Sequence, residues 1–431
     1  MTTRPNPMRT MMNKRAAGEK TGMPSYCTAN QLVIEAILQR TAVTRRPVLI
    51  EATANQVNQE GGYTGMRPAE YYRWVLELAA QHGVSEDLII LAGDHLGPLT
   101  FTDLPEREAM AKAKVLVYEY ARAGFTKIHL DTSMKVADDP EGPLATETVA
   151  RRGKELYDVA IKAYAELLQE VPDAPRPVFI IGSEVPIPGG AQEAEDTLTV
   201  TKPEAFADTV ETYKTVFGKA MDDVIAVVVQ PGVEFGDDQV FLYNRNNAAA
   251  LSAKLADYPG LVFEGHSTDY QSKEALREMV EDGVGILKVG PALTYAMREA
   301  LFALSLIEKE LVPEHAQSNV METLDLIMLE SPANWMKHYR GTEQECALAR
   351  KYSFSDRARY YIGDPKVQSA VTTLFINLRT HEIPMNMIHQ YLPLQFDAVR
   401  KGTLSKDPAD LVRDAVWQVL YDYEYAAGFT N

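Results

Sequence analysis

The segment Leu91-Ala92-Gly93-Asp94-His95-Leu96-Gly97-Pro98 bears on both the fold and the site. It continues an apolar run at residues 88–91, which is typical of a buried strand. The strand ends in an acid and a histidine, and a Gly-Pro pair then turns the chain. A carboxylate beside an imidazole can hold a metal ion or move a proton. The alternative is that Asp94 caps the next segment and His95 is a hydrogen-bonded buried histidine.

The same order of strand and helix recurs along the chain. Strands are predicted at residues 21–26, 48–53, 88–94, 127–131, 178–184, 225–230, 261–266 and 286–290, with helices between them. Strict alternation favours parallel strands with helical crossovers. Eight such units over roughly 280 residues predict a (β/α)8 TIM barrel, a fold of about 250 residues. A doubly wound sheet is the main alternative, but no Gly-x-Gly-x-x-Gly motif follows an early strand.

The domain organisation follows from where this alternation begins and ends. From about residue 298 onward the sequence predicts helices with no strands between them. We therefore predict a flexible N-terminal tail over residues 1–20, the barrel over residues 21–300, and a helical extension packed on the barrel over residues 301–431.

Composition narrows the class of protein. The chain has 431 residues and a formal net charge of −17, which argues against nucleic acid or an anionic membrane as the main partner. An anionic small substrate needs only a few local cations. Two cysteines, Cys27 and Cys346, fit no metal-binding spacing and no disulfide framework, so we expect a cytoplasmic protein. No apolar run reaches the roughly 18 residues of a membrane span.

Polar residues gather where the predicted strands end, which is the catalytic end of a TIM barrel. They are Glu51, Asp94 with His95, Asp131, Glu184, Gln230, Glu264 with His266, and Lys288. Imidazole suits zinc and similar divalent ions, so His95 and His266 are the best metal-ligand candidates. A third ligand could be Glu184 or Gln230. His129 lies within a strand, where a core role or support of a ligand is expected.

Four regions could bind a phosphate. Glycine pairs at residues 61–62 and 189–190 could let backbone N–H groups approach an anion. Small and hydroxyl residues follow strands seven and eight, where many barrels bind phosphate: Ser267, Thr268, Gly290 and Thr294. Residues 352–361 carry two arginines that could close over a phosphate or form a salt-bridged surface. We expect substrate contacts at Glu51, Asn55, Gln56, Ser267, Lys288, Arg357 and Tyr360.

These motifs resemble the tagatose-bisphosphate aldolase Z-subunit family, of the GatZ/KbaZ type. The matching stretches are residues 22–27, 51–59, 61–65, 93–98, 129–131, 182–186, 263–270 and 352–361. The family in turn resembles the metal-dependent class II aldolases, in which an Asp-His pair ends a strand. There the Asp moves the proton of the C4 hydroxyl and the His binds zinc. Asp94 and His95 match that pair, and His266 resembles the late zinc-binding histidine. Where the aldolases have a further histidine, this chain has Gln230, a departure from their zinc ligation.

The resemblance implies carbohydrate metabolism, such as galactitol catabolism, with three possible functions. The first is a ketohexose-phosphate 4-epimerase that interconverts D-tagatose 6-phosphate and D-fructose 6-phosphate by a metal-assisted retro-aldol route. Asp94 would move the hydroxyl proton, assisted by Glu184 or Asp131. The second is an accessory subunit that stabilises a class II D-tagatose-1,6-bisphosphate aldolase. The third, a tagatose-6-phosphate kinase, is disfavoured because the chain has no Gly-x-x-x-x-Gly-Lys-Ser/Thr loop.

Overall fold

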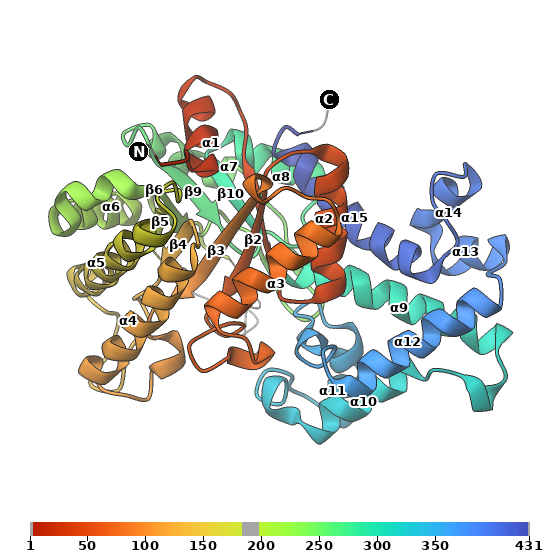
Figure 1. The fold of residues 1–431 in the computed structure, drawn as a ribbon. Helices are drawn as coiled ribbons and strands as arrows, with labels where there is room; N and C mark the ends of the chain where they lie inside the picture. Colours follow the sequence, from red (N-terminus) through yellow and green to blue (C-terminus); the bar gives the residue numbers. More distant parts are fainter. Residues whose placement is uncertain (1–2, 183–197, 430–431) are drawn as a thin grey trace.

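The computed structural model describes residues 3–182 and 198–429. Eight parallel strands close into a barrel in the order β1-β10-β9-β6-β5-β4-β3-β2 (Figure 1). They are β1 (Met23–Cys27), β2 (Val48–Thr53), β3 (Ile89–Leu96), β4 (Lys127–Leu130), β5 (Val178–Ile181), β6 (Val224–Val229), β9 (Val262–Gly265) and β10 (Val284–Val289). The prediction of a (β/α)8 barrel is confirmed. A separate antiparallel pair, β7 (Glu234–Phe235) and β8 (Val240–Phe241), follows β6.

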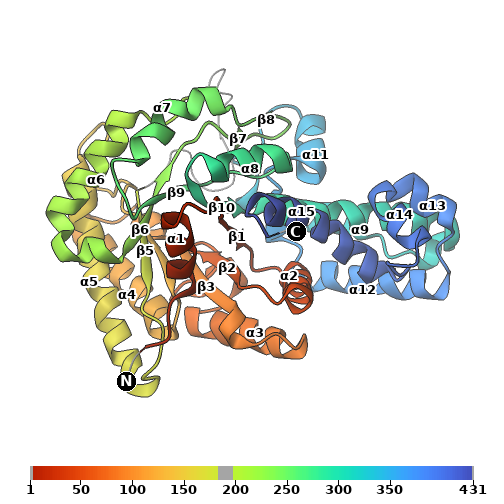
Figure 2. The same cartoon turned by 90° about the horizontal axis from the view of Figure 1, so that it is seen from above.

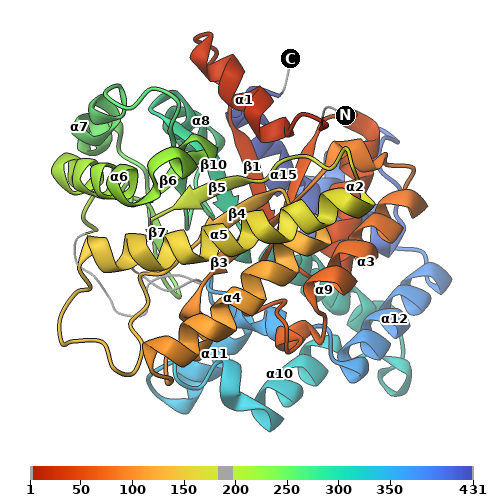
Figure 3. The same cartoon turned by 60° about the vertical axis from the view of Figure 1, so that its left-hand side comes forward.

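Helices cover the outside of the barrel. All but the last return the chain to the start of the next strand, and the last leads out of the barrel. They are α2 (Gln31–Thr44), α3 (Pro68–Gln81), α4 (Glu106–Ala123), α5 (Thr146–Glu170), α6 (Pro203–Phe217), α7 (Arg245–Leu255), α8 (Lys273–Glu281) and α9 (Pro291–Leu311). Figure 3 shows α4 and α5 side by side across this outer layer. Gly124 ends α4 with φ of 101°, a backbone conformation that favours glycine, and β4 begins three residues later.

The N-terminal segment differs from the flexible tail that the sequence predicts. Residues Pro7–Ala16 form α1, which lies across the end of the barrel where the strands begin (Figure 2). Met8 and Met11 of α1 pack with apolar side chains of the barrel interior, and Met8 is fully buried. The Asn6 side chain caps α1 and donates hydrogen bonds to two backbone carbonyls near the starts of β4 and β5. Burial of the two methionines explains why the segment is ordered.

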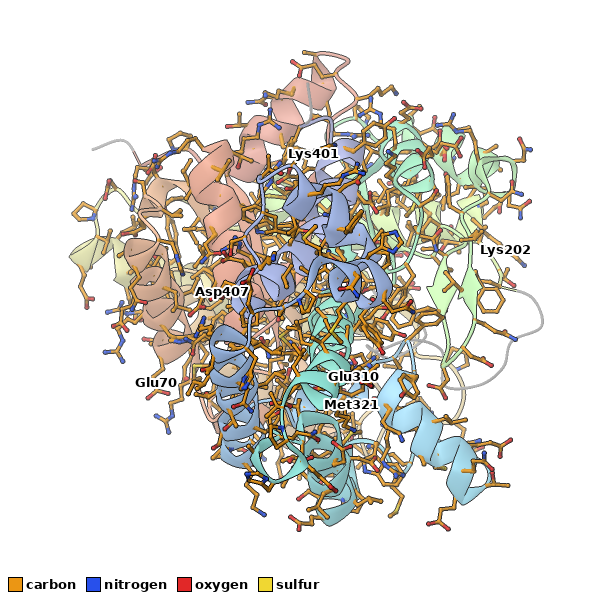
Figure 4. The ribbon with its side chains drawn as sticks, turned by 90° about the vertical axis from the view of Figure 1, so that its right-hand side faces the viewer. Glu70, Lys202, Glu310, Met321, Lys401 and Asp407 are labelled. Carbon is orange, nitrogen blue, oxygen red and sulfur yellow. The ribbon has the colours of Figure 1, made fainter. Side chains whose placement is uncertain are left out.

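Beyond α9 the chain forms the predicted helical extension. Its helices are α10 (Val320–Glu330), α11 (Glu343–Tyr352), α12 (Pro365–Thr380), α13 (Met385–Tyr391), α14 (Pro393–Arg400) and α15 (Pro408–Ala426). The extension projects to one side of the barrel in Figures 1 and 2, and Figure 4 views it end-on, with Glu310, Met321 and Asp407 labelled. α15 returns to the barrel, where Glu424 pairs with Arg40 of α2 and Trp417 donates a hydrogen bond to the Ala36 carbonyl.

α15 also reaches the loop that follows β9. The Tyr423 hydroxyl lies 2.8 Å from the carbonyl oxygen of Thr268 and 2.9 Å from its side-chain oxygen. The extension therefore supports a loop at the C-terminal end of the barrel strands. In the described parts of the chain, no helix is long and apolar enough to cross a membrane.

Candidate active site

The strand carrying Asp94 and His95 is irregular where these residues lie. The pairing of β3 with β4 shifts register between Gly93 and Leu96, and His95 has a φ of 50°. In a regular strand, adjacent side chains point to opposite faces. The bulge instead brings both side chains into the same polar cluster at the barrel's C-terminal end, where each is at least 95% buried.

Three histidines meet in this cluster. The ring centroids of His95, His129 and His266 lie between 5.1 and 5.4 Å from one another. The His129 ring comes from β4, and His266 directly follows β9. The sequence predicts His95 and His266 as site residues, and for His129 it predicts a core role or support of a ligand. Alternation alone does not show which face of β4 points into the barrel.

A group of four side chains offers ligands for a divalent metal ion. One donor atom each from Asp94, His129, Glu264 and His266 lies within 4.8 Å of the other three. Imidazole nitrogens with carboxylate oxygens are a donor set that zinc and similar ions accept. His129 Nε2 also lies 2.8 Å from the carbonyl oxygen of Gly182. A backbone carbonyl in this place commonly orients a metal-binding imidazole.

The hydrogen bonds around His129 support the fit. A carbonyl oxygen only accepts, so Nε2 carries the proton, and Nδ1 accepts a hydrogen bond from the His95 backbone N–H at 3.3 Å. Nδ1 nevertheless lies 2.7 Å from Asp94 Oδ1. Two lone pairs this close need a proton or a metal ion shared between them.

Asp131 orients the His95 ring through its Nδ1 atom. His95 Nδ1 lies 2.7 Å from Asp131 Oδ2, and His95 Nε2 lies 3.4 Å from Asp94 Oδ2. Burial raises the pKa of Asp131, but the hydrogen bond and positive charge of His95 outweigh it, and the pKa lies well below its usual value. Asp131 is therefore a carboxylate that orients His95, and it does not line the cavity described below.

A fully buried lysine ties two carboxylates together beneath the cluster. Lys127 Nζ lies 2.6 Å from Glu51 Oε1 and 2.8 Å from Glu264 Oε2. Burial lowers the pKa of Lys127, but the two carboxylates outweigh it and the pKa is raised. Glu51 also accepts a hydrogen bond from the Ser25 hydroxyl at 2.5 Å. The sequence predicts Glu51 as a substrate contact, whereas its side chain is fully buried against Lys127. Lys127 is not among the predicted site residues.

Lys288, at the end of β10, contacts Asp94 directly. Its Nζ forms an ion pair with Asp94 Oδ2 and lies 3.8 Å from Glu51 Oε2. The Asp94 carboxylate thus has His129 on one oxygen and Lys288 on the other. These two contacts fix the direction of the carboxylate.

A cavity opens beside Asp94 at the C-terminal end of the barrel. Its lining residues are Cys27, Thr53, Asn55, Gln56, Tyr63, Asp94, His95, Phe235, His266, Ser267, Asp269, Lys288, Val289, Gly290, Pro291, Arg359 and Tyr360. The predicted substrate contacts Asn55, Gln56, Ser267, Lys288 and Tyr360 are therefore brought together around Asp94, His95 and His266.

Other predicted residues lie elsewhere. Arg357 donates a hydrogen bond to the Asn334 carbonyl and does not line the cavity, whereas Arg359 does. Gln230 Oε1, its one possible ligand atom, accepts two backbone N–H bonds from Gly232 and Val233. Glu184 and the glycines at residues 189–190 lie outside the described residues.

Most of the predicted phosphate-binding groups form hydrogen bonds within the protein. The N–H of Gly62 donates to the Asn58 side chain. The hydroxyls of Thr268 and Thr294 are bonded to Lys288 O and Asp356. Asp269 accepts the N–H groups of Gly290 and Ala292 at the start of α9. Burial raises the pKa of Asp269 to about 6.

Two parts of the chain that lie far apart in sequence form the roof of the cavity. Tyr63 lies in the 3₁₀ turn Gly62–Thr64 after β2, and Tyr360 lies in the 3₁₀ turn Arg357–Tyr360 of the extension. Their rings meet edge to face with centroids 4.7 Å apart. Gly62 allows this loop, because a Cβ at its position would lie 2.4 Å from the Gln56 carbonyl oxygen.

Comparison with solved structures gives a near relative over most of the chain. A crystal structure titled a probable tagatose 6 phosphate kinase, from Sinorhizobium meliloti 1021, is 44% identical, with a TM-score of 0.85. The match covers 94% of this chain and 100% of that one. The YdjI aldolase from Escherichia coli K12 is 13% identical with a TM-score of 0.43, over 85% of this chain and 100% of that one. Fructose-bisphosphate aldolase from Campylobacter jejuni is 14% identical with a TM-score of 0.43, over 88% and 95%.

One family model spans nearly the whole chain. It describes the D-tagatose-1,6-bisphosphate aldolase subunit GatZ/KbaZ-like proteins and matches residues 8–428, which include the barrel, the catalytic end and the extension. The resemblance predicted from the motifs is thereby confirmed, and this chain belongs to the GatZ/KbaZ-like family.

Proposed function

We propose that the protein is a ketohexose-phosphate 4-epimerase that interconverts D-tagatose 6-phosphate and D-fructose 6-phosphate. The observation that carries the proposal is the Asp94 carboxylate. It lines the cavity, is held by Lys288 and His129, and lies within the cluster of possible metal ligands. Such a carboxylate is placed to exchange a proton with a sugar hydroxyl while charge develops beside a cationic centre.

The chemistry of the substrate favours bond cleavage. The C4 hydrogen of a 2-ketose is not acidified by the C2 carbonyl, so direct abstraction of that hydrogen is difficult. In a retro-aldol step the C4 hydroxyl loses its proton, the C3–C4 bond breaks, and its electron pair stays with the three-carbon ketose fragment. C4 becomes an aldehyde. Rotation of the aldehyde and bond formation on its other face invert C4, and the hydroxyl recovers its proton, so no other reactant is consumed.

The residues of the cavity fit these requirements. Asp94 accepts the proton of the C4 hydroxyl and returns it when the bond re-forms. Lys288 keeps Asp94 oriented and offers a positive charge next to the developing negative charge. Asn55, Gln56 and Ser267 line the same cavity and offer hydrogen bonds to sugar hydroxyls.

The cluster also provides for a metal ion. Asp94, His129, Glu264 and His266 would hold it, with His95 alongside. A divalent ion bound there would supply Lewis-acid stabilisation of the negative charge on the ketose fragment. His266 Nε2 lies 3.0 Å from Glu264 Oε1, so two of the side chains that would hold the ion are already in contact. Burial lowers the pKa of His266 to about 4, which keeps its nitrogen available as a ligand at neutral pH.

A second candidate is an accessory subunit of a class II D-tagatose-1,6-bisphosphate aldolase. The family's description as an aldolase subunit favours it. So does the extension, where α10, α11 and the segment between them expose large apolar side chains: Leu326, Leu329, Met336 and Leu348. This role would need no cavity with an oriented carboxylate, so we rank it second.

The purified chain alone, in buffer without ATP, separates these functions. D-tagatose 6-phosphate is added, and D-fructose 6-phosphate is followed through phosphoglucose isomerase and glucose-6-phosphate dehydrogenase. The epimerase forms product without any partner, loses activity in EDTA and recovers it with added divalent metal. Absence of product with every divalent ion tried would contradict the proposal and leave the accessory role.

A further inference from the structure

Arg359 is a cation without a carboxylate partner at the edge of the cavity. Within residues 3–182 and 198–429, no carboxylate oxygen lies within 4.0 Å of its guanidinium nitrogens. Its donors go to the backbone carbonyls of Ser355 and Asp356 and to the Tyr360 hydroxyl. The buried arginines Arg152 and Arg298 have carboxylate partners, and the buried Arg357 bonds the Asn334 carbonyl and does not line the cavity.

Arg359 stands between two cavities. It lines the catalytic cavity together with His266 and Lys288. It also lines an outer cavity of about 650 Å³, between the β1–α2 loop and the extension. The two cavities share Cys27, Gln56, Tyr63, Arg359 and Tyr360. The guanidinium carbon lies 4.5 Å from the Tyr360 ring centroid, and this cation–π contact restricts the orientation of the Arg359 side chain.

We propose that Arg359 binds the terminal phosphate of the substrate and makes the site select phosphorylated over free ketohexoses. This inference rests on the proposed function, because it assigns the C6 end of the same substrate. A planar guanidinium fits a phosphate with two parallel hydrogen bonds. The other cationic side chain of the cavity, Lys288, is already paired with Asp94.

The charge of the molecule strengthens the argument. With a net charge of −17, the protein repels anions at long range, and the binding of a sugar phosphate needs a local cation. Asp269, which lines the same cavity, is held by the backbone N–H groups of Gly290 and Ala292, and Asp356 is paired with Arg298. Selection for phosphate then comes from the extension, while the proton chemistry comes from the barrel.

Calorimetric binding measurements on the full chain test the inference without requiring turnover. The ligands are D-tagatose 6-phosphate, free D-tagatose and inorganic phosphate. For the wild type we expect the sugar phosphate to bind about 100-fold more tightly than the free sugar, since charge-assisted hydrogen bonds supply the difference. In Arg359→Met this preference falls to a few-fold, whereas affinity for free D-tagatose is unchanged. Arg359→Lys keeps the charge but loses the planar fork, and is expected to lie between them.

The control is Arg400→Met, which removes an exposed cation of α14 and should leave all three affinities unchanged. Far-ultraviolet circular dichroism verifies folding of each variant. Should Arg359→Met fail to fold, the inference is tested by the preference of Arg359→Lys and by competition between inorganic phosphate and D-tagatose 6-phosphate for the wild type. A full preference in Arg359→Lys together with no competition overturns the inference, as does an undiminished preference in a folded Arg359→Met. Selective binding by the wild type that depends on Arg359, but without epimerisation, would overturn the proposed function alone and support the role of Arg359.

Discussion

His129 Nδ1 lies 2.7 Å from Asp94 Oδ1, although the hydrogen bond from Nε2 to Gly182 places the ring proton on the opposite nitrogen. Two acceptors at this separation require a proton or a metal ion shared between them. Asp94 is therefore both part of the possible metal site and the residue we assign to proton transfer. The same contact makes the chemistry of the cavity dependent on His129 of β4, for which the sequence predicts only a core role or support of a ligand.

Asp94→Asn removes the base and should lower kcat of the epimerase by about 10³-fold or more, in the upper part of the range for general acid–base groups. The amide keeps the shape of the side chain but removes the charge that pairs with Lys288, so the variant should fold with a lowered thermal unfolding midpoint. The coupled assay measures kcat, and circular dichroism measures the midpoint. The matched control is Asp397→Asn on the exposed face of α14, which should retain full activity. Full activity in Asp94→Asn would exclude this residue as the base.

His129→Ala and His266→Ala should each weaken binding of divalent metal at least tenfold, because each removes one of four donor side chains. Elemental analysis after dialysis against a metal buffer measures the occupancy. His381→Ala, at the end of α12, is the control, because that imidazole bonds only its own helix backbone among the described residues. Equal occupancy in all three variants would show that this cluster does not bind the metal.

Much of this arrangement could be predicted from the sequence, and the rest depends on side-chain direction. Strand–helix alternation predicts the barrel, and the rule that chemistry lies at the strand ends predicts Asp94 and His266. His129 and Lys127 occupy alternate positions of β4, but which face points inward depends on the register with β3 and β5, and that register includes a bulge. A motif cannot show that bulge.

Two other differences have local causes. The sequence alone does not show which of Arg357 and Arg359 faces the cavity. In the 3₁₀ turn their side chains point in different directions, and Arg359 is the one that lines the cavity. The segment at residues 7–16 has no strong apolar face. Its two buried methionines pack against the end of the closed barrel, a contact that the local sequence does not predict.

Lys127→Met should destabilise the fold by about 3–5 kcal/mol, because it leaves Glu51 and Glu264 as buried carboxylates without their shared cation. Urea unfolding followed by fluorescence measures the free energy. Lys154→Met breaks an exposed pair with Asp158 on α5 and should change stability by at most about 0.5 kcal/mol. Similar effects of the two substitutions would mean that Lys127 is not the partner of these carboxylates.

The raised pKa of Asp269 predicts a dependence of stability on pH. Burial raises its pKa from 3.8 to about 6, so between these values the folded chain binds a proton that the unfolded chain has lost. The contribution of this group to stability is greatest below pH 4 and falls as pH rises through 6, by about 3 kcal/mol in total. Asp269→Asn should remove this dependence and be more stable than the wild type at pH 7. Urea titrations at pH 4, 5, 6 and 7 measure it, and parallel pH profiles for the two proteins would contradict the assignment.

The most direct test of the account is epimerisation in deuterium oxide. The purified chain, loaded with divalent metal and without ATP or a partner protein, is incubated with D-tagatose 6-phosphate and followed by proton and carbon NMR. Cleavage of the C3–C4 bond leaves the C4 hydrogen attached throughout, so the account predicts D-fructose 6-phosphate with hydrogen retained at C4. Deuterium at C4 would contradict the retro-aldol route, and absence of D-fructose 6-phosphate would contradict the epimerase itself.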